Sequence, residues 1–174
     1  PLFAVLSDWH NHKPLARLLQ GAAGIFCDEK LRQRLTQEHP AFAHKVKYWP
    51  AYSFEPSLMA SVTRPVERDI DVLFVGNTNP HKYVQRNQLL FRIANLPQVK
   101  LHVASGLSET EHMALLRRSK IAFNHSLRQE MNLRAYEATA CGALLLMEAD
   151  NLEVNRFLQP DTAYVPYTPQ NLEA

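Results

Sequence analysis

The segment 129–142 combines an acidic side chain, a basic side chain and small residues in a pattern suited to binding a nucleotide. We expect a helix that starts beside the preceding loop, carries Glu137 about one turn inside, and stops at Gly142. The Glu137 carboxylate could accept two hydrogen bonds from a vicinal diol such as the ribose hydroxyls, and its charge would strengthen them. Arg134 and the helix N-terminus would face phosphate oxygens. The competing interpretation, which helix position alone favours, places Glu137 in solvent.

A second group of candidate residues follows the hydrophobic run 71–75. Gly76 and Asn77 come directly after the run, and Lys82 and Arg86 follow about one helical turn apart. A glycine permits close approach of the backbone, and a helix N-terminus offers unpaired N–H groups and the positive end of a dipole. These features would suit a diphosphate. A tight turn with solvated charges is an equally open interpretation, because one glycine is a weaker signal than a complete phosphate-binding loop.

The polar residues 124–128, starting at Asn124, follow another hydrophobic run. Polar side chains at the carboxyl end of a strand are candidates for ligand contact in α/β sheets. Taken alone, this segment is more typical of a polar surface loop.

Other chemistries have less support in the sequence. His10 and His12 lie two apart after a predicted strand, where they would share one face, but no third metal ligand accompanies them, so a polar loop is favoured. Ser108 and Ser126 lie near histidines but lack the context of a nucleophile elbow. We therefore expect no metal site and no serine-based catalytic triad.

The composition indicates a soluble globular protein. The chain has 174 residues, of which 46% are hydrophobic and 21% charged, and its net charge is +2. That small charge gives no support to nucleic-acid binding, and no apolar run is long enough to span a membrane. The two cysteines, Cys27 and Cys141, lie in apolar surroundings and indicate a reducing compartment, so we expect a cytoplasmic protein.

Apolar runs and helical patterns alternate along the chain, which predicts an α/β fold with a doubly wound, mostly parallel sheet. In the second part of the chain we expect five strands, at 71–75, 99–103, 121–123, 143–147 and 163–165, with a further helix over 150–158. In such a sheet, ligands bind outside the carboxyl ends of the strands, at the point where the strand order reverses.

The first part of the chain predicts a smaller α/β unit. We expect residues 1–49 to be the end of one domain, 50–68 to be a proline-containing linker, and 69–174 to be a second domain. Because Thr168-Pro169 looks like the start of a helix, we expect the sequence to be a fragment of a longer enzyme, truncated at both ends.

The string from Arg134 to Ala143 resembles the signature R-x-F-E-A-x-A-C-G-x of GT-B glycosyltransferases. It is most similar to the spore-maturation-type group within the group 1 (family 4-like) superfamily. The segments 71–77 and 119–124 also match that group, and the resemblance covers about residues 70–167. What precedes it resembles the last part of the family's N-terminal, acceptor-side domain.

The resemblance implies a Rossmann-like C-terminal domain that binds a nucleoside diphosphate sugar. In the family, the Glu that matches Glu137 holds the ribose, while the basic residues that match Lys82 and Arg86 hold the diphosphate together with backbone before the helix. The expected donor-binding residues are Gly76, Asn77, Lys82, Arg86, Asn124, Met131, Asn132, Leu133, Arg134 and Glu137. The family has an earlier Glu that contacts the sugar, but here Gln129 occupies that position and Glu130 lies one residue away, so the sugar contact is not assigned.

The resulting hypothesis is transfer of a sugar to an acceptor, which could be a glycan, a protein or a small molecule. Lys82, Arg86, Arg134 and helix N-termini would stabilise the leaving diphosphate without a metal or other cofactor. Retention of configuration is implied by the resemblance alone, and no general base is assigned. The alternatives are a non-catalytic α/β nucleotide-binding or signalling module, which needs an acidic cluster at strand ends, and a dehydrogenase, which needs an absent GxGxxG motif.

Overall fold

The computed structural model describes residues 1–6, 16–50 and 66–173. These residues form parts of two compact units, Pro1–Ser53 and Phe54–Ala174. Most of the predicted linker and the predicted His10 and His12 pair lie outside the described residues. No helix among the described residues has the length and hydrophobicity required to cross a membrane.

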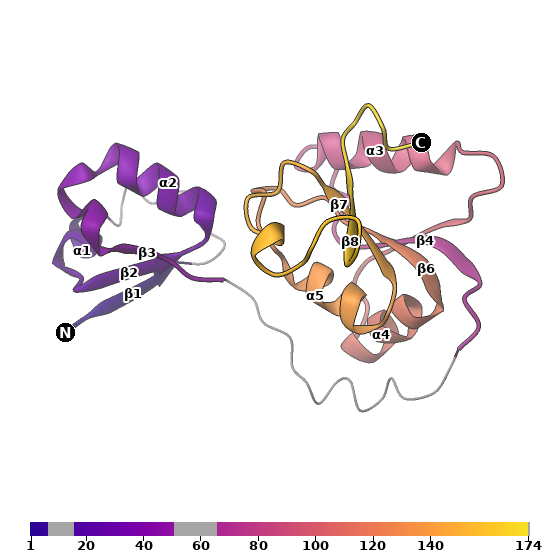
Figure 1. Ribbon diagram of the computed structural model, residues 1–174, viewed down its shortest axis with the longest axis horizontal. Coiled ribbons are helices and arrows are strands. Elements are labelled where there is room, and N and C mark those ends of the chain that lie inside the picture. The colour runs from indigo at the N-terminus through magenta and orange to yellow at the C-terminus, as the bar shows by residue number, and fades with distance from the viewer. Residues whose placement is uncertain (7–15, 51–65, 174) are drawn as a thin grey trace. The chain divides into compact units, whose positions relative to one another are not determined.

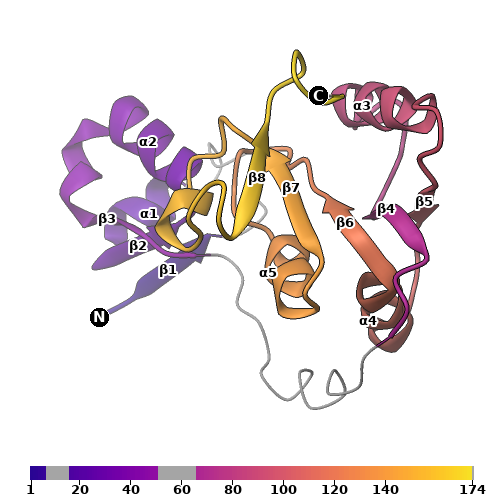
Figure 2. The same ribbon diagram turned by 45° about the vertical axis from the view of Figure 1, so that its right-hand side comes forward.

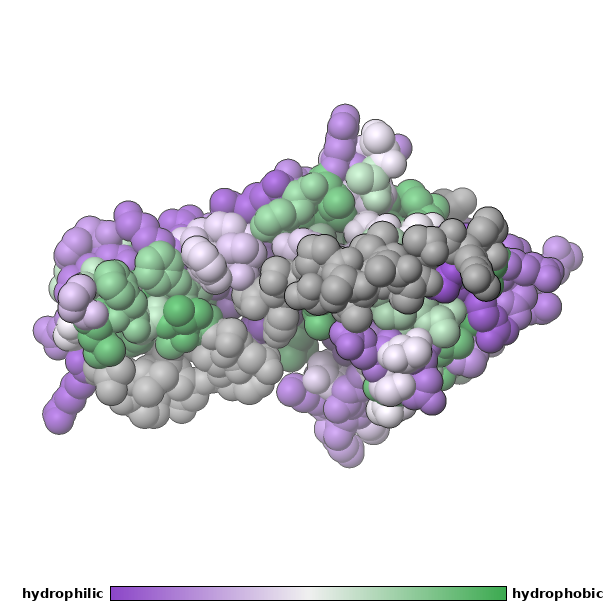
Figure 3. Space-filling view, turned by 90° about the horizontal axis from the view of Figure 1, so that it is seen from below, coloured by the Kyte–Doolittle hydropathy of each residue, from purple (hydrophilic) through white to green (hydrophobic). Residues whose placement is uncertain are grey.

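The first unit is a small parallel α/β element. Its elements are β1 (Phe3–Leu6), α1 (Ala16–Gly21), β2 (Gly24–Cys27), α2 (Glu29–Glu38), the 3-10 helix η2 (Pro40–Lys45) and β3 (Val46–Tyr48), with strand order β1-β2-β3. Asp28 begins α2 by accepting a hydrogen bond from the Leu31 N–H at 2.9 Å. Leu31 and Leu35 point from α2 into the core of the unit. On β1, Phe3 and Val5 are exposed, and hydrophobic side chains gather on the visible surface of this unit (Figure 3).

The second unit carries the larger sheet, with five strands that are all parallel. Its elements are β4 (Ile70–Val75), α3 (Val84–Ala94), β5 (Leu101–Ala104), α4 (Glu109–Arg118), β6 (Ser119–Phe123), α5 (Leu133–Ala140), β7 (Leu144–Glu148), the 3-10 helix η4 (Val154–Arg156) and β8 (Tyr164–Tyr167). The strand order is β5-β4-β6-β7-β8. The five strands predicted from the sequence are therefore confirmed, with small changes at their ends.

Helices cover both faces of this sheet, with α3 on one side and α4 and α5 on the other (Figures 1 and 2). Successive residues of β4 point to opposite faces, as the pleat of a strand requires. Leu73 packs with Met113 of α4 and Ala135 of α5, whereas Phe74 packs with Leu89 of α3. The expected doubly wound α/β fold is confirmed, and the reversal of strand order falls between β4 and β6.

The helix predicted over 150–158 is wrong, because only the short 3-10 helix η4 forms there. The Asn151 side chain accepts hydrogen bonds from the N–H groups of Glu153 at 3.0 Å and Val154 at 2.9 Å, which makes a tight turn. Side chains of Asn and Asp compete with helix formation in this way.

Successive side chains of β7 point to opposite faces of the sheet, and this alternation in burial can be tested. Leu145 is fully buried, whereas its neighbour Leu144 is 45% exposed. We expect Leu145→Ala to lower the free energy of unfolding of the second unit by about 2–5 kcal/mol through the cavity that it leaves. Leu144→Ala is the matched control and should change it by less than about 1 kcal/mol. Denaturant unfolding followed by circular dichroism measures both variants, and equal losses would contradict the register of β7.

Candidate functional site

The candidate site lies where β4 and β6 end side by side. In the sheet, β5 lies on one side of β4 and β6 lies on the other. The chain segments that follow β4 and β6 therefore run in opposite directions across the sheet. Gly76 and Asn77 follow β4, and Asn124 and His125 follow β6. Because β4 and β6 pair in parallel, the two segments lie at the same edge of the sheet.

Arg86 of α3 ties these two segments together. Its Nε and Nη2 atoms donate to the His125 carbonyl at 3.0 and 2.7 Å, and its Nη1 atom donates to the Asn77 carbonyl at 3.1 Å. The side chain is only 4% exposed, and its guanidinium lies 4.3 Å from the centre of the Tyr83 ring. Burial, together with the charge of Arg134, lowers the pKa of Arg86 to about 10, so it remains protonated near neutral pH. Three of its five N–H groups are engaged, and its contact with diphosphate stays a prediction.

Arg134 brings a second guanidinium to the same place. It donates from Nε to the Asn124 side-chain oxygen at 3.1 Å, and it lies 5.4 Å from the centre of the Phe74 ring, which Arg86 approaches at 5.3 Å. These hydrogen bonds of the two arginines go to neutral oxygens rather than to carboxylates. Burial lowers the pKa of Arg134, and two such cations held near one ring favour an anion beside them.

Gly76 permits this arrangement. A Cβ atom at this position would lie 2.7 Å from Arg134 Nη1 and 3.0 Å from Phe74 Cζ, both closer than a side chain normally tolerates. Arg134 therefore lies across the end of β4 because residue 76 has no side chain. This close approach is one physical reason for a glycine at position 76.

Glu137 lies on the same face of α5 as Arg134, one turn further along. It is 6% exposed, so the alternative that it points into solvent is wrong. Its Oε2 atom is 3.5 Å from Nδ1 of His112 on α4. Burial raises the pKa of Glu137, while the charge of Arg134 opposes that shift. Burial and Arg134 also lower the pKa of His112, so its imidazole is mainly neutral near pH 7.

The N-terminus of α5 completes the group. Asn132 caps the helix by accepting from the Ala135 N–H at 3.3 Å, and it donates to the Asn124 side-chain oxygen at 3.2 Å. Leu133 is 39% exposed and begins the helix, where backbone N–H groups have no partner within the helix. Met131 is buried, and its N–H donates to Glu153 at 2.9 Å.

The loop 77–82 is held by its own side chains and lies at the surface. The Asn77 side chain accepts from the Asn79 N–H at 2.8 Å, and the Asn79 side chain accepts from the N–H groups of His81 and Lys82 at 2.9 and 3.2 Å. The Lys82 ammonium lies 5.3 Å from the Tyr83 ring and is exposed. Lys82 is therefore an accessible cation near the more buried arginines.

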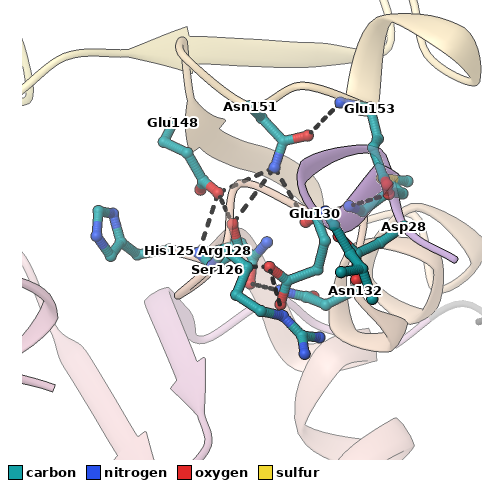
Figure 4. Close-up of polar contacts among 12 residues, drawn as sticks. Asp28, His125, Ser126, Arg128, Glu130, Asn132, Glu148, Asn151 and Glu153 are labelled. Carbon is teal, nitrogen blue, oxygen red and sulfur yellow. Dashed lines mark hydrogen bonds and ion pairs between the residues drawn. The ribbon is translucent and has the colours of Figure 1, made fainter. Parts of the chain in front are cut away.

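Sequence reasoning missed a buried acidic network beside this site. Glu148, at the end of β7, accepts through Oε1 from the Ser126 N–H at 3.0 Å, from the Ser126 hydroxyl, and from the Asn151 side chain at 3.0 Å (Figure 4). Ser126 is thus a hydrogen-bond donor to a carboxylate. Burial raises the pKa of Glu148 to about 7. The position of Glu148 at the end of a strand was the sequence feature that could have indicated this network. An acidic residue after an apolar strand is, however, also typical of a strand that ends in solvent. Nothing in the sequence around His112 indicated that it would lie beside Glu137.

Among the residues described by the structure, no group of three or more His, Cys, Asp or Glu side chains is arranged to hold a metal ion. The cations and helix N–H groups are the features near β4 and β6 that suit an anionic ligand.

Comparisons with known proteins agree with this fold. The model of the family described as glycosyl transferase-like matches residues 60–174. Among solved structures, the chain is similar to the pneumococcal O-GlcNAc transferase GtfA, solved in complex with UDP and GlcNAc, with 13% sequence identity and a TM-score of 0.60. The match covers 97% of this chain and 42% of that chain, so the sequence spans less than half the length of this neighbour. No curated protein matches the sequence.

Glu148 gives the stability of the second unit a defined pH dependence. Its pKa is about 7 in the folded protein, against 4.5 as the ordinary value, so folding favours the protonated form. Its contribution to stability is complete below about pH 4.5 and is lost as the pH rises through about 7, with a change of roughly 3 kcal/mol. Glu148→Gln keeps an acceptor oxygen and removes the titration.

Denaturant unfolding at pH 5 and pH 8 measures this effect. The free energy of unfolding of Glu148→Gln, measured relative to that of the wild type, should be higher at pH 8 than at pH 5. His125, whose pKa burial lowers to about 4, titrates alike in both proteins and cancels in the comparison. Parallel pH profiles for the two proteins would show that Glu148 titrates normally.

Proposed function

The chain belongs to the glycosyl transferase-like family, and we propose that it binds a nucleoside diphosphate sugar and transfers the sugar to an acceptor. The observation that carries this proposal is the position of Glu137, a buried carboxylate one helical turn from Arg134. A buried carboxylate is stable only where it is paired or hydrogen-bonded. A ribose diol would supply two donors to it while the neighbouring cation faces the phosphates.

The diphosphate would lie against the positive end of the site. Lys82, Arg86, Arg134 and the N–H groups at the start of α5 supply its charge, and Gly76 and Asn77 supply backbone beside the end of β4. The paired guanidiniums near Phe74 support this assignment, because an anion between or beside them relieves their mutual repulsion.

The reaction that follows from this placement is substitution at the anomeric carbon of the donor. The bond from that carbon to the diphosphate breaks, its electron pair leaves with the diphosphate, and the acceptor oxygen forms the new bond and releases its proton. Positive charge placed in advance stabilises the leaving group, so we propose that no metal is needed. Retention of configuration and membership of the spore-maturation-type group rest on the sequence resemblance alone.

UDP is the first nucleotide to test, since GtfA was solved with UDP bound. The acceptor is an open part of the proposal. We also propose a reducing compartment such as the cytoplasm, a proposal supported by the burial of both thiols, Cys27 and Cys141, in apolar cores.

Removing the charge of Glu137 tests the ribose contact. We expect Glu137→Gln to weaken binding of the best ligand among UDP, GDP and dTDP by about 10- to 100-fold, because hydrogen bonds to a charged acceptor contribute about 1.5–3 kcal/mol. Isothermal titration calorimetry measures the affinities. The exposed residue Glu67 provides a control of equal charge change, and Glu67→Gln should bind as the wild type does. Preference for NAD over all three nucleotides, or equal affinity of Glu137→Gln and wild type, would contradict the proposal.

Lys82 tests the diphosphate contact without disturbing a buried network. We expect Lys82→Ala to weaken UDP binding by roughly 3- to 10-fold at low salt and to leave uridine binding unchanged, because only the diphosphate carries charge. The difference should shrink as salt is added.

Lys100→Ala is the matched control, since Lys100 is exposed and immediately precedes β5, at the amino end of that strand. Equal losses for UDP and uridine in Lys82→Ala would remove Lys82 from the site.

A further inference from the structure

The β7–β8 connection is joined to the β6–α5 loop by a chain of hydrogen bonds. The β6–α5 loop, residues 124–132, leads into the helix that carries Arg134 and Glu137. The facing segment is 148–154, which begins at the last residue of β7. Figure 4 shows side chains of the two segments pointing toward each other.

Contacts between the two segments occur along most of the loop. Glu148 binds Ser126 at its start. In the middle, the Leu152 N–H donates to the Gln129 carbonyl at 2.9 Å, and the Gln129 side chain donates to Asp150 at 2.7 Å. The conformation of the β6–α5 loop therefore depends on hydrogen bonds to segment 148–154 as well as on its own residues.

Asn151 is central to these contacts. Its side-chain nitrogen donates both to Glu148 Oε1 and to the Glu130 carbonyl, each at 3.0 Å. Its side-chain oxygen accepts from the N–H groups of Glu153 and Val154. Asn151 is 6% exposed, so the loss of any of these bonds leaves buried polar groups without partners.

Glu153 holds the end of the loop. Its Oε2 atom accepts from the Met131 N–H at 2.9 Å, immediately before the cap residue Asn132, and its side chain is 1% exposed. A carboxylate beside a helix N-terminus is stabilised by the helix dipole. It also fixes where the helix begins and hence where the first free N–H groups point.

We propose that Asn151 and Glu153 are positioning residues for the donor site: they hold the β6–α5 loop so that the N-terminus of α5 and Arg134 meet the diphosphate. The proposal rests on the proposed function. Neither residue needs to touch the ligand, because each acts through backbone groups of Glu130 and Met131. Small displacements of groups that orient a ligand are known to have large effects on affinity and rate.

Amide hydrogen exchange tests the anchoring without any ligand. We expect the Met131 amide to lose protection in Glu153→Ala and to keep it in Glu153→Gln, which retains an acceptor oxygen. Asn151→Ala should increase exchange across residues 126–131. Asn155→Ala is the matched control, because Asn155 is exposed, lies directly after the segment in η4, and accepts only from the Tyr164 hydroxyl in the contacts described. Unchanged protection of Met131 in Glu153→Ala would overturn the proposal.

UDP affinity of the same proteins tests the consequence for the site. We expect Glu153→Ala and Asn151→Ala to bind UDP roughly 10-fold more weakly than the wild type. Glu153→Gln and Asn155→Ala should bind it as tightly as the wild type. A residue that only stabilises the fold would lower the melting temperature and leave the affinity of the folded protein unchanged, and that result would overturn the proposal.

UDP, GDP and dTDP binding by the wild type distinguishes failure of the positioning role from failure of the proposed function. Binding of UDP, GDP or dTDP by the wild type with no loss in the variants overturns the positioning role and leaves the proposed function standing. If the wild type binds none of these nucleotides, the proposed function fails, and the positioning of a donor site fails with it.

Discussion

Charged groups buried at the carboxyl edge of the larger sheet constrain the rest of this structure. Removing a charge from water is unfavourable unless hydrogen bonds or an opposite charge replace the lost hydration. Arg86 hydrogen-bonds to backbone carbonyls, and the half-buried Arg134 has an amide oxygen and an aromatic ring beside it. Glu148 meets the requirement only in part, because its Oε1 atom accepts from Ser126 and Asn151 while burial still raises its pKa to about 7. These contacts connect segments that are distant in the sequence. The hydrogen bonds that stabilise the buried charges therefore also hold the loops around the site in place.

The same constraint connects the site to the sheet. Arg86 joins the segments after β4 and β6, and Glu148 joins those after β6 and β7. The carboxyl ends of three adjacent strands are thereby held in one arrangement. Gly76 contributes by the absence of a side chain, which leaves room for Arg134 beside Phe74. A site built in this way has its cations in place before a ligand arrives, which is the condition for stabilising developing negative charge.

Much of the fold was predictable from the sequence because hydrophobic runs and helix signals are local. The five strands of the second unit and the helix that carries Glu137 follow from such patterns. The pairing of His112 with Glu137 and the partners of Asn151 were not predictable, because they depend on contacts between elements. The missing helix over 150–158 has the same cause, since the Asn151 side chain makes a turn that helical propensity does not reveal.

The most direct test of a ligand site at this edge is a titration of the isotopically labelled protein with UDP, followed by amide chemical shifts. The account predicts that the largest changes occur at Gly76, Leu133 and Arg134, around the ends of β4 and β6 and the start of α5. It would be contradicted by saturating changes confined to the amino ends of the strands, or by the absence of any change at millimolar UDP, GDP and dTDP.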